Sequence, residues 1–392
     1  MSPGSLFDSA TVPDWATPSA DDATRSADLA ALIAADIGRH GGWIPFARFM
    51  HLALYAPGLG YYSASPTLGE GGDFVTAPEL TPMFGQCLAT LFPLVRATID
   101  AADILEVGAG SGKLARDVLA ALQQQNCLPR RYYILEVSAA LRARQEQTLA
   151  SQPSLRERVQ WIDTLPKNFR GLVLGNEVLD AMPVERFVLR SDGAHTLEVG
   201  IDSGRFVWRE GARHEAISAR LAPLSLAAGY TSEINFAAEA WMRSLGDALE
   251  AGLVVLIDYG FPRAEYYHPD RRDGTLMCHY RQRAHADPLV LVGLQDITAH
   301  IDFSAIAAAG IDAGLTLAGY TSQAAFLLGS GLATLAAESD PNDTRAHLER
   351  MQAVKKLTLP HEMGELFKVI GLTKGVDLKL AGFALQDRRH RL

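Results

Sequence analysis

The stretch Ile104-Leu-Glu-Val-Gly108-Ala-Gly110-Ser-Gly112-Lys113 decides the fold of this chain. A short apolar run leads into three glycines at alternate positions, and a helical pattern follows them. Glycine adopts a positive φ at low cost and has no side chain, so such a turn lets a ligand lie against bare backbone. The helix after the turn directs free N–H groups at that ligand. The stretch therefore predicts a strand, a glycine-rich loop and a helix that bind a small molecule together.

The spacing of the glycines separates this loop from two common nucleotide-binding loops. A dinucleotide fingerprint G-x-G-x-x-G that starts at Gly108 requires glycine where the chain has Lys113. A P-loop that ends at Gly112 and Lys113 requires glycine at 107 and Ser or Thr at 114. The chain has Val107 and Leu114 at those two positions. Neither fingerprint is complete, so an NAD-dependent oxidoreductase is disfavoured.

The remaining pattern places an acid, Glu106, two residues before the first glycine. It resembles motif I of class I S-adenosylmethionine (SAM) methyltransferases. A carboxylate there would repel a pyrophosphate, but it suits a ligand that carries a sulfonium and an ammonium group. A structural turn without a ligand stays open as the alternative. The residues expected to contact the cofactor in this segment are Glu106, Gly108, Ala109, Gly110, Ser111 and Gly112.

Composition excludes several other classes of protein. The 392 residues carry a net charge of −9 with acids and bases mixed along the chain, which argues against broad nucleic-acid binding. The three cysteines are widely spaced and form no C-x-x-C, so we expect neither a disulfide framework nor a zinc knuckle, and no other metal site. No apolar run reaches the ~18 residues of a membrane span. Residues 1–25 lack the features of a secretory signal or a presequence.

From residue 103 onward, strand and helix patterns alternate, which is typical of a parallel sheet covered on both faces. We expect an α/β fold of the class I SAM-methyltransferase type, Rossmann-like, with a mostly parallel seven-stranded sheet. The predicted strands of this sheet are 104–107, 132–136, 159–162, 172–174 and 253–257, with a late hairpin of 315–320 and 366–372 at the edge. Between the fourth and fifth strands, we expect short antiparallel strands at 186–189, 196–201 and 206–210 and a helix at 233–251.

The chain before the first core strand reads as a helical module. Apolar residues at helical spacing predict helices at 26–40, 44–55 and 84–95, with glycine-rich loops between them. The expected division is a flexible tail at 1–25, an N-terminal helical module with lid loops at 26–100, and a methyltransferase core at 101–392. Within the core we expect an insertion at about 184–250 and helical additions at about 321–360.

Acidic residues follow the second and third predicted strands. Glu136 ends the second strand, where an acid reaches the ribose hydroxyls of a bound nucleoside, and Val137 lies beside it. NAD enzymes use the same device, so Glu136 indicates a nucleoside without naming it. Trp161 and Asp163, at the end of the third strand, are candidates for contact with the adenine ring and its amino group.

The fourth predicted strand runs into Asn176-Glu177-Val-Leu-Asp180. In doubly wound sheets the chemistry lies at the carboxyl ends of the strands. Glu177 and Asp180 are three residues apart, so they share a face if the turn is helical, and paired carboxylates match the forked donors of a guanidinium. We expect Glu177 as the first and Asp180 as the second catalytic acid, with Asn176 near the cofactor. Helix capping by Asn176 and Glu177 is the structural alternative.

Several further motifs carry a family resemblance that covers roughly residues 28–385. The motifs are Phe46-x-x-Phe49-Met50, Gly60-Tyr61-Tyr62, Gly72-Asp73-Phe74-x-Thr76-Ala-Pro-Glu79, Asn176-Glu177-x-Leu-Asp180-Ala-x-Pro183, Asp258-Tyr-Gly260 and Gln295-Asp296-Ile-Thr298. Together with the glycine loop, they resemble the MidA-like family, which includes the mitochondrial complex I assembly methyltransferase and its bacterial relatives.

The resemblance implies a SAM-dependent protein-arginine methyltransferase whose protein substrate is the 49-kDa-type subunit of NADH–quinone oxidoreductase. We expect residues 57–80 to cover the site, with Thr76 near the cofactor and Asp73 as a third acid near the acceptor. Since residues 1–25 do not resemble a presequence, the resemblance implies a bacterial cytoplasmic member of the family. Two alternatives remain: a small-molecule methyltransferase, and a SAM-binding assembly factor without turnover.

Overall fold

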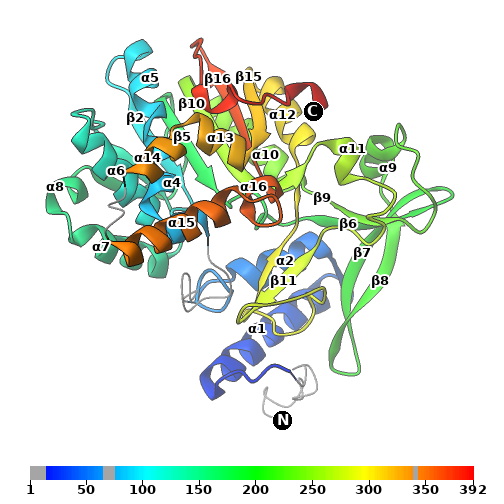
Figure 1. Ribbon diagram of the computed structural model, residues 1–392. Coiled ribbons are helices and arrows are strands. Elements are labelled where there is room, and N and C mark those ends of the chain that lie inside the picture. The colour runs from blue at the N-terminus through cyan, green and yellow to red at the C-terminus, as the bar shows by residue number, and fades with distance from the viewer. Residues whose placement is uncertain (1–14, 65–75, 339–342) are drawn as a thin grey trace.

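The computed structural model describes residues 15–64, 76–338 and 343–392. Its centre is an eight-stranded sheet with the order β15-β16-β10-β5-β2-β3-β4, in which β14 also pairs with β10 (Figure 1). All neighbouring strands are parallel except β16, which runs antiparallel to both β10 and β15. The strands are β2 (Asp103–Val107), β3 (Tyr132–Leu135), β4 (Val159–Ile162), β5 (Phe169–Asn176), β10 (Leu249–Phe261), β14 (Ile301–Asp302), β15 (Thr316–Ser322) and β16 (Phe367–Lys374).

Helices cover both faces of this sheet, because its central strands are apolar on both sides. One core contains side chains of α4 (Pro82–Ala89), α5 (Leu91–Thr98), α6 (Lys113–Gln124), α7 (Ala139–Ala150), α8 (Pro153–Arg156), α13 (Gln323–Gly329), α14 (Leu332–Ala337) and α15 (Thr344–Thr358). The core on the opposite face contains α10 (Phe236–Ala248) and α12 (Phe303–Asp312). Short helices complete the chain: α3 (Ala77–Leu80), α9 (Glu215–Leu221), α11 (Arg263–Tyr266), α16 (Met363–Leu366), and the 3-10 turns Ala381–Phe383 and Arg389–Arg391.

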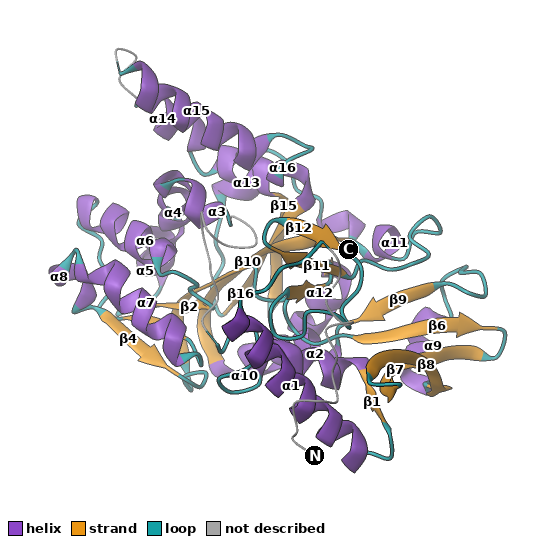
Figure 2. Ribbon diagram, turned by 90° about the horizontal axis from the view of Figure 1, so that it is seen from below, coloured by secondary structure: helices purple, strands orange, loops and turns teal. Residues whose placement is uncertain are grey.

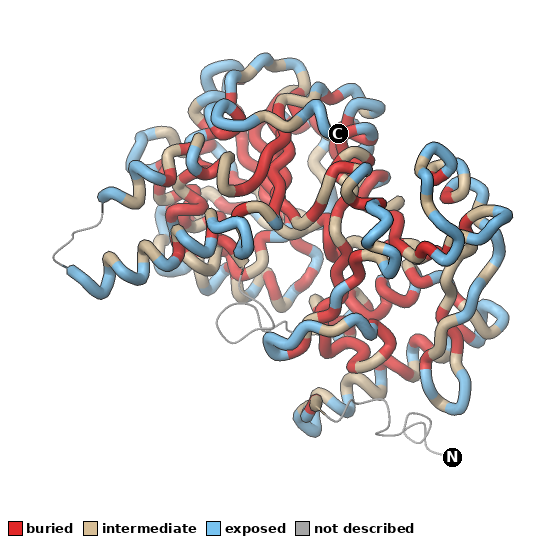
Figure 3. The backbone as a smooth tube through the Cα atoms, turned by 45° about the vertical axis from the view of Figure 1, so that its right-hand side comes forward, coloured by how far each residue is buried: buried red, intermediate tan, exposed pale blue. Residues whose placement is uncertain are grey.

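A second unit, which we call the cap, lies below and beside the central sheet in Figure 1. It contains the helices α1 (Ala20–Arg39) and α2 (Phe46–Tyr55). Its larger, antiparallel sheet consists of β1 (Trp43–Pro45), β6 (Glu185–Arg190), β7 (Gly193–Asp202), β8 (Arg205–Arg213) and β9 (Thr231–Ile234). Its smaller sheet consists of β11 (Met277–Tyr280), β12 (Arg283–His285) and β13 (Asp296–Thr298). Figure 2 shows the two strand systems side by side, and Figure 3 shows buried backbone running through both.

The cap is built from three distant parts of the sequence. The N-terminal β1 pairs with β7, so it joins the sheet formed by residues 185–234. One core cluster combines Phe46 and Phe49 of α2 with Val199 of β7 and Ile297 of β13. The residues of the predicted N-terminal module and those of the predicted insertion therefore share one sheet and one core.

Most predicted strands are confirmed within two residues at their ends, apart from β5, β7, β8 and β10, which are longer than predicted. The predicted hairpin of late strands is confirmed as β15 and β16 at the edge of the sheet. The α/β class is confirmed as well, with β14 as an eighth, two-residue strand beyond the seven that were expected.

Several predicted helix boundaries differ from the structure. α1 begins at Ala20, inside the predicted flexible tail, because Ser19 caps it through a bond from the Asp22 N–H. Residues 43–45 form β1 rather than the start of a helix, since they pair with β7. The predicted helix at 84–95 is two helices that meet at Thr90. The predicted helix at 233–251 begins only at Phe236, after β9, and its last residues belong to β10.

Among the described residues, no helix combines the length and the apolar character needed to cross a lipid bilayer.

Two glycines allow the three central strands to approach closely at their amino ends. Gly171 of β5 has a φ of +150°, and a Cβ on it would lie 1.9 Å from the Asp103 carbonyl oxygen. Gly252 of β10 has a φ of +154°, and its Cβ would lie 1.9 Å from the Gly171 carbonyl oxygen. Neither neighbour can retreat, since each is backbone of a paired central strand.

We therefore expect Gly171→Ala to lower the free energy of unfolding by about 3 kcal/mol or more, through steric overlap with the β2 backbone. Gly314→Ala is the matched control, because Gly314 also has a positive φ (+79°) but no atom lies within 4 Å of its Cβ position. That control should cost only about 1 kcal/mol. Urea unfolding measures both values, and equal losses in the two variants would contradict the steric argument.

Candidate cofactor and acceptor site

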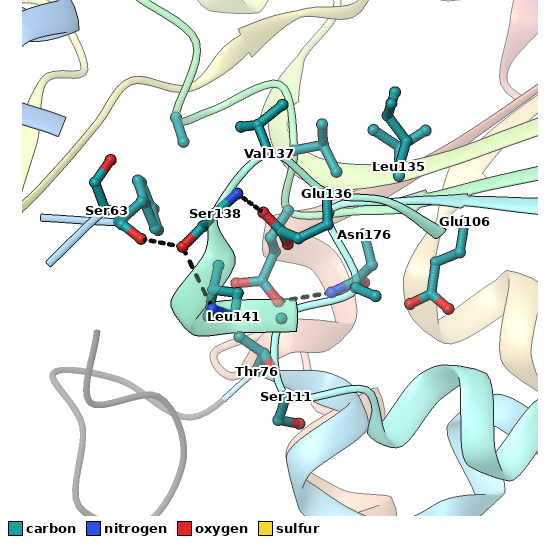
Figure 4. A pocket seen from close by; sticks show the side chains of 18 of the residues that line it. Ser63, Thr76, Glu106, Ser111, Leu135, Glu136, Val137, Ser138, Leu141 and Asn176 are labelled. Carbon is teal, nitrogen blue, oxygen red and sulfur yellow. Dashed lines mark hydrogen bonds between the residues drawn. The ribbon is translucent and has the colours of Figure 1, made fainter. Parts of the chain in front are cut away.

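A cavity of about 770 Å³ opens at the carboxyl ends of β2, β3 and β5, between the central sheet and the cap. In Figure 4, Glu106, Glu136 and Asn176 are grouped along one side of it, with Thr76 and Ser111 below them. The described residues on its wall include four glutamates and no Lys, Arg or His. These glutamates are Glu79, Glu106, Glu136 and Glu177.

The glycine loop forms one side of the cavity through Gly108, Ala109, Gly110 and Ser111. Gly108 and Gly110 have φ angles of +64° and +52°, so both stand in the left-handed region that favours glycine. Gly112 lies outside the cavity wall. It is the N-cap of α6 with a φ of +82°, and a Cβ on it would lie 3.0 Å from the Gln145 Cα.

Glu106 lies on the cavity wall at the end of β2 and is 2% exposed. The Tyr132 hydroxyl donates a hydrogen bond to its Oε2. Burial raises the pKa of this carboxyl to about 7, and the Tyr132 bond partly opposes the shift. A cation near Glu106 would favour its ionised form, which agrees with the predicted sulfonium or ammonium ligand.

Glu136 lies at the carboxyl end of β3, next to the exposed Val137, and both line the cavity. Its Oε1 accepts the Ser138 backbone N–H at 2.9 Å, and its Oε2 accepts the Gln145 amide at 3.0 Å. Each carboxylate oxygen has a second lone pair, so Glu136 retains the capacity to accept from the two hydroxyls of a ribose.

The two residues predicted to contact adenine lie outside the cavity wall. Trp161 instead donates its Nε1–H to the Gln145 Oε1 at 2.7 Å, and Arg156 stacks on its ring at 4.4 Å. Asp163 is exposed after the end of β4. The structure therefore links Trp161 to Glu136 and to the glycine loop through Gln145.

Helix α3 fastens the N-terminal segment to the glycine loop. Glu79 of α3 accepts a hydrogen bond from the Ser111 Oγ, and its Oε2 lies 2.6 Å from the Lys113 Nζ. Thr76, the residue before α3, lines the cavity as the sequence predicted. Glu79 was not predicted as a site residue, although it belongs to the same motif as Thr76.

The turn after β5 is held by a buried carboxylate at the end of β10. The Asp258 Oδ2 accepts three consecutive backbone N–H groups, from Val178 at 3.2 Å, Leu179 at 2.8 Å and Asp180 at 3.3 Å. Glu177, the residue just before them, has a φ of +53°, which is uncommon for a residue with a side chain. Such a conformation persists only where its surroundings impose it, and it concentrates at functional sites.

Glu177 lines the cavity, as predicted. Its Oε1 accepts the Asn176 amide at 2.9 Å, and its Oε2 lies 3.5 Å from the Tyr259 hydroxyl. Burial, followed by the charge of Asp258, raises the pKa of Glu177 to about 8. Burial likewise raises the pKa of Asp258, to about 7.

Asp180, the second predicted catalytic acid, does not reach the cavity wall. It is 2% exposed behind the turn, and its Oδ1 has no hydrogen-bond partner among the described residues. Burial and the charges of Asp258, Glu177 and Asp296 raise its pKa well above the usual range. Glu177 thus lines the cavity and Asp180 does not, because the helical turn that would put both on one face does not form. Asp73 lies outside the described residues.

Two tyrosines of the cap form the remaining wall, and sequence reasoning did not single them out as site residues. The rings of Tyr55 and Tyr62 stack with centroids 5.5 Å apart. The Tyr55 hydroxyl donates to the Ala181 carbonyl at 2.9 Å, and the Tyr62 hydroxyl donates to the Asp296 Oδ1 at 2.8 Å. The Gly60-Tyr61-Tyr62 motif was the available signal, but the place of Tyr62 on the cavity wall is a tertiary property.

The chemistry of the wall selects between cofactor classes. The described wall has no Lys, Arg or His that could pair with the pyrophosphate of NAD. Glu79 is ion-paired with Lys113, which lies off the wall, and the wall's acids together disfavour such a ligand. They suit a ligand that combines positive charge with ribose hydroxyls, which is the chemistry of SAM. Among the described residues, no group of three or more His, Cys, Asp or Glu side chains is arranged to hold a metal ion.

Comparison with known proteins identifies relatives of the whole chain. Residues 83–321 match the family model Methyltransf_28, described as "Putative S-adenosyl-L-methionine-dependent methyltransferase". The chain is 27% identical over 377 residues to the human mitochondrial protein arginine methyltransferase NDUFAF7, covering 84% of this chain and 80% of that protein. The zebrafish (Danio rerio) NDUFAF7 is 26% identical over 359 residues, with 83% and 82% covered.

Two solved structures from Burkholderia thailandensis are similar to this chain over nearly its full length. One is a COG1565 superfamily member bound to S-adenosyl-homocysteine, 47% identical, with a TM-score of 0.93 and coverage of 97% of this chain and 100% of that one. The other is a native structure from the same superfamily, 48% identical, with a TM-score of 0.91 and the same coverage. On the family match and these likenesses, the chain belongs to the Methyltransf_28 family of S-adenosyl-L-methionine-dependent methyltransferases.

Proposed function

We propose that this protein transfers a methyl group from SAM to a nitrogen of an arginine side chain in a protein substrate. The observation that carries the proposal is Glu177, a carboxyl held at a φ of +53° on the wall of the cofactor cavity. Its raised pKa makes it a proton acceptor when a bound guanidinium favours its ionised form. The name of the NDUFAF7 relatives supports the arginine acceptor, and the Burkholderia relative with bound S-adenosyl-homocysteine supports the cofactor.

The cavity divides into two halves of different chemistry. The glycine loop and Glu136 would hold the cofactor, and Glu106 would neutralise its positive charge. The other half is lined by Tyr55, Tyr62 and Met182, with Glu177 among them. The two aromatic rings and the thioether suit the aliphatic stem of an arginine, and the tyrosine faces also attract its cationic head.

A guanidinium is a poor nucleophile because its nitrogen lone pairs are delocalised and it stays protonated in water, with a pKa above ~12. Bound SAM supplies the methyl group as an electrophile. Glu177 would accept hydrogen bonds from the guanidinium, fix the orientation of one nitrogen, and take the proton that this nitrogen releases as it becomes methylated. Asp258 would act indirectly, by holding the turn that presents Glu177.

The natural acceptor, on the family resemblance, is an arginine of the 49-kDa-type subunit of NADH–quinone oxidoreductase. An arginine that enters a cavity of about 770 Å³ beside a bound cofactor must lie on an accessible segment. We therefore infer that methylation precedes assembly of the complex. A bacterial cytoplasmic location, where such a subunit is made, is part of the same proposal.

Glu177→Gln should lower turnover by about 10²–10⁴-fold, because glutamine keeps the shape of glutamate but cannot take a proton. Affinity for S-adenosylhomocysteine should change little. The assay is transfer of labelled methyl from SAM into protein of a lysate from cells that lack the gene. Asp180→Asn is the matched control and should retain measurable turnover, since Asp180 lies off the cavity wall. Equal loss in both variants would contradict the assignment of Glu177.

Glu177 should also make stability depend on pH. Its pKa in the folded protein, about 8, lies above its ordinary value near 4.5, so its contribution to stability is lost as pH rises toward and through 8. Relative to the wild type, the Tm of Glu177→Gln should therefore rise between pH 5 and pH 8, by roughly 2–4 °C. Glu349→Gln, a change at an exposed residue of α15, should show no such trend. A constant Tm difference across this range would contradict the raised pKa.

Mass spectrometry of the 49-kDa-type subunit, from cells with and without this gene, tests the acceptor. We expect one arginine to carry methyl groups only when the gene is present and the enzyme has an intact Glu177. An identical methylation pattern in both strains would exclude this acceptor. The small-molecule methyltransferase or the assembly factor without turnover would then replace it.

A further inference from the structure

Two side chains of helix α7, one turn apart, donate hydrogen bonds to the glycine loop. The Gln145 Nε2 donates to the Gly110 carbonyl at 3.1 Å, and the Thr148 Oγ1 donates to the Ser111 carbonyl at 2.6 Å. Residues three apart on a helix point in nearly the same direction, so consecutive carbonyls of the loop meet consecutive donors of α7. A carbonyl held in this way cannot rotate toward the cavity without losing its bond.

The orientation of the Gln145 amide is fixed by its partners. The indole N–H of Trp161 can only donate, so the oxygen of the amide must face it. The amide nitrogen then faces the Gly110 carbonyl and the Glu136 Oε2, which both accept. Gln145 thus links the glycine loop, the acid that ends β3 and the indole of β4.

The position of Gln145 allows little adjustment. The side chain is fully buried, at 0% exposed, and all of its hydrogen bonds connect elements of the cofactor half. The loop glycine Gly112 packs directly on its backbone, with the Gly112 Cβ position 3.0 Å from the Gln145 Cα. A buried amide network of this kind holds its members rigidly when every partner is satisfied.

We propose that Gln145 and Thr148 are positioning residues that preset the glycine loop and Glu136 for the cofactor, with Trp161 holding Gln145 in register. The inference concerns only the cofactor half of the site, so it does not depend on the identity of the acceptor. It assigns to Trp161 a role through Gln145 in place of the predicted contact with adenine.

The test compares three variants of the full chain in calorimetric titrations with S-adenosylhomocysteine. Gln145→Met keeps the length of the side chain and removes two donors and one acceptor, so its Kd should rise by about tenfold or more. Thr148→Val keeps the shape and removes one donor, and its Kd should rise by about three- to fivefold. Trp161→Phe should fall between the wild type and Gln145→Met, because Gln145 keeps its other partners.

Gln323→Met is the matched control. Gln323 is also 0% exposed, and its amide also donates to a backbone carbonyl, that of Leu357 at 3.1 Å, but it lies off the cavity wall. This variant should lose thermal stability through the lost Leu357 bond and bind S-adenosylhomocysteine with the wild-type Kd. The control therefore separates a loss of general stability from a loss of loop geometry.

Rescue by a conservative change adds a second readout. Thr148→Ser restores the hydroxyl donor, so its Kd should return to within twofold of the wild type. If Gln145→Met loses stability but keeps the wild-type Kd, Gln145 is merely structural and the proposal is wrong. If the wild type itself does not bind S-adenosylhomocysteine, the assignment of the cofactor fails instead.

Discussion

The site depends on the carboxylate of Asp258, which accepts three consecutive backbone N–H groups from the turn after β5. This bond set satisfies amides that would otherwise be buried without partners, and it holds the chain in a sharp turn rather than a regular helix. The turn places Glu177 at a positive φ on the cavity wall and leaves Asp180 behind it. The buried carboxylate of Asp258 therefore holds the turn in which Glu177, and not Asp180, lines the cavity.

The same region concentrates negative charge away from water. Burial raises the pKa values of Glu177, Asp180 and Asp258, and the charges of neighbouring acids raise those of Glu177 and Asp180 further. A cavity of this kind favours a ligand that brings positive charge, since a cation converts repulsion among the acids into attraction. Both partners of the proposed reaction meet this requirement, because SAM is a sulfonium and arginine a guanidinium. The acidic wall is thus a common physical basis for cofactor choice and acceptor choice.

The cap completes the site from parts that are distant in sequence. Tyr62 shows how, because its ring stacks on Tyr55, its hydroxyl bonds to Asp296, and its carbonyl accepts from Ser138 at 3.0 Å. It thereby connects α2, the small β11–β13 sheet and the start of α7. The part of the cavity wall that Tyr55 and Tyr62 form therefore depends on all three segments. The cofactor half, in contrast, is organised within the central sheet and α7.

The sequence by itself determined the α/β class, the central strands and the glycine loop. It also determined that Glu106, Glu136 and Glu177 stand at the carboxyl ends of central strands. These features follow from local rules, because strand periodicity, glycine spacing and the end of a strand are all readable within a few residues. Only the tertiary structure decided that β1 pairs with β7 and that Tyr55 and Tyr62 line the cavity. It also decided that Asp180 lies off the cavity wall and that Gln145 bonds to the glycine loop. Each of them rests on a contact between residues far apart in the chain or on a backbone angle imposed from outside, and no local pattern records such a contact.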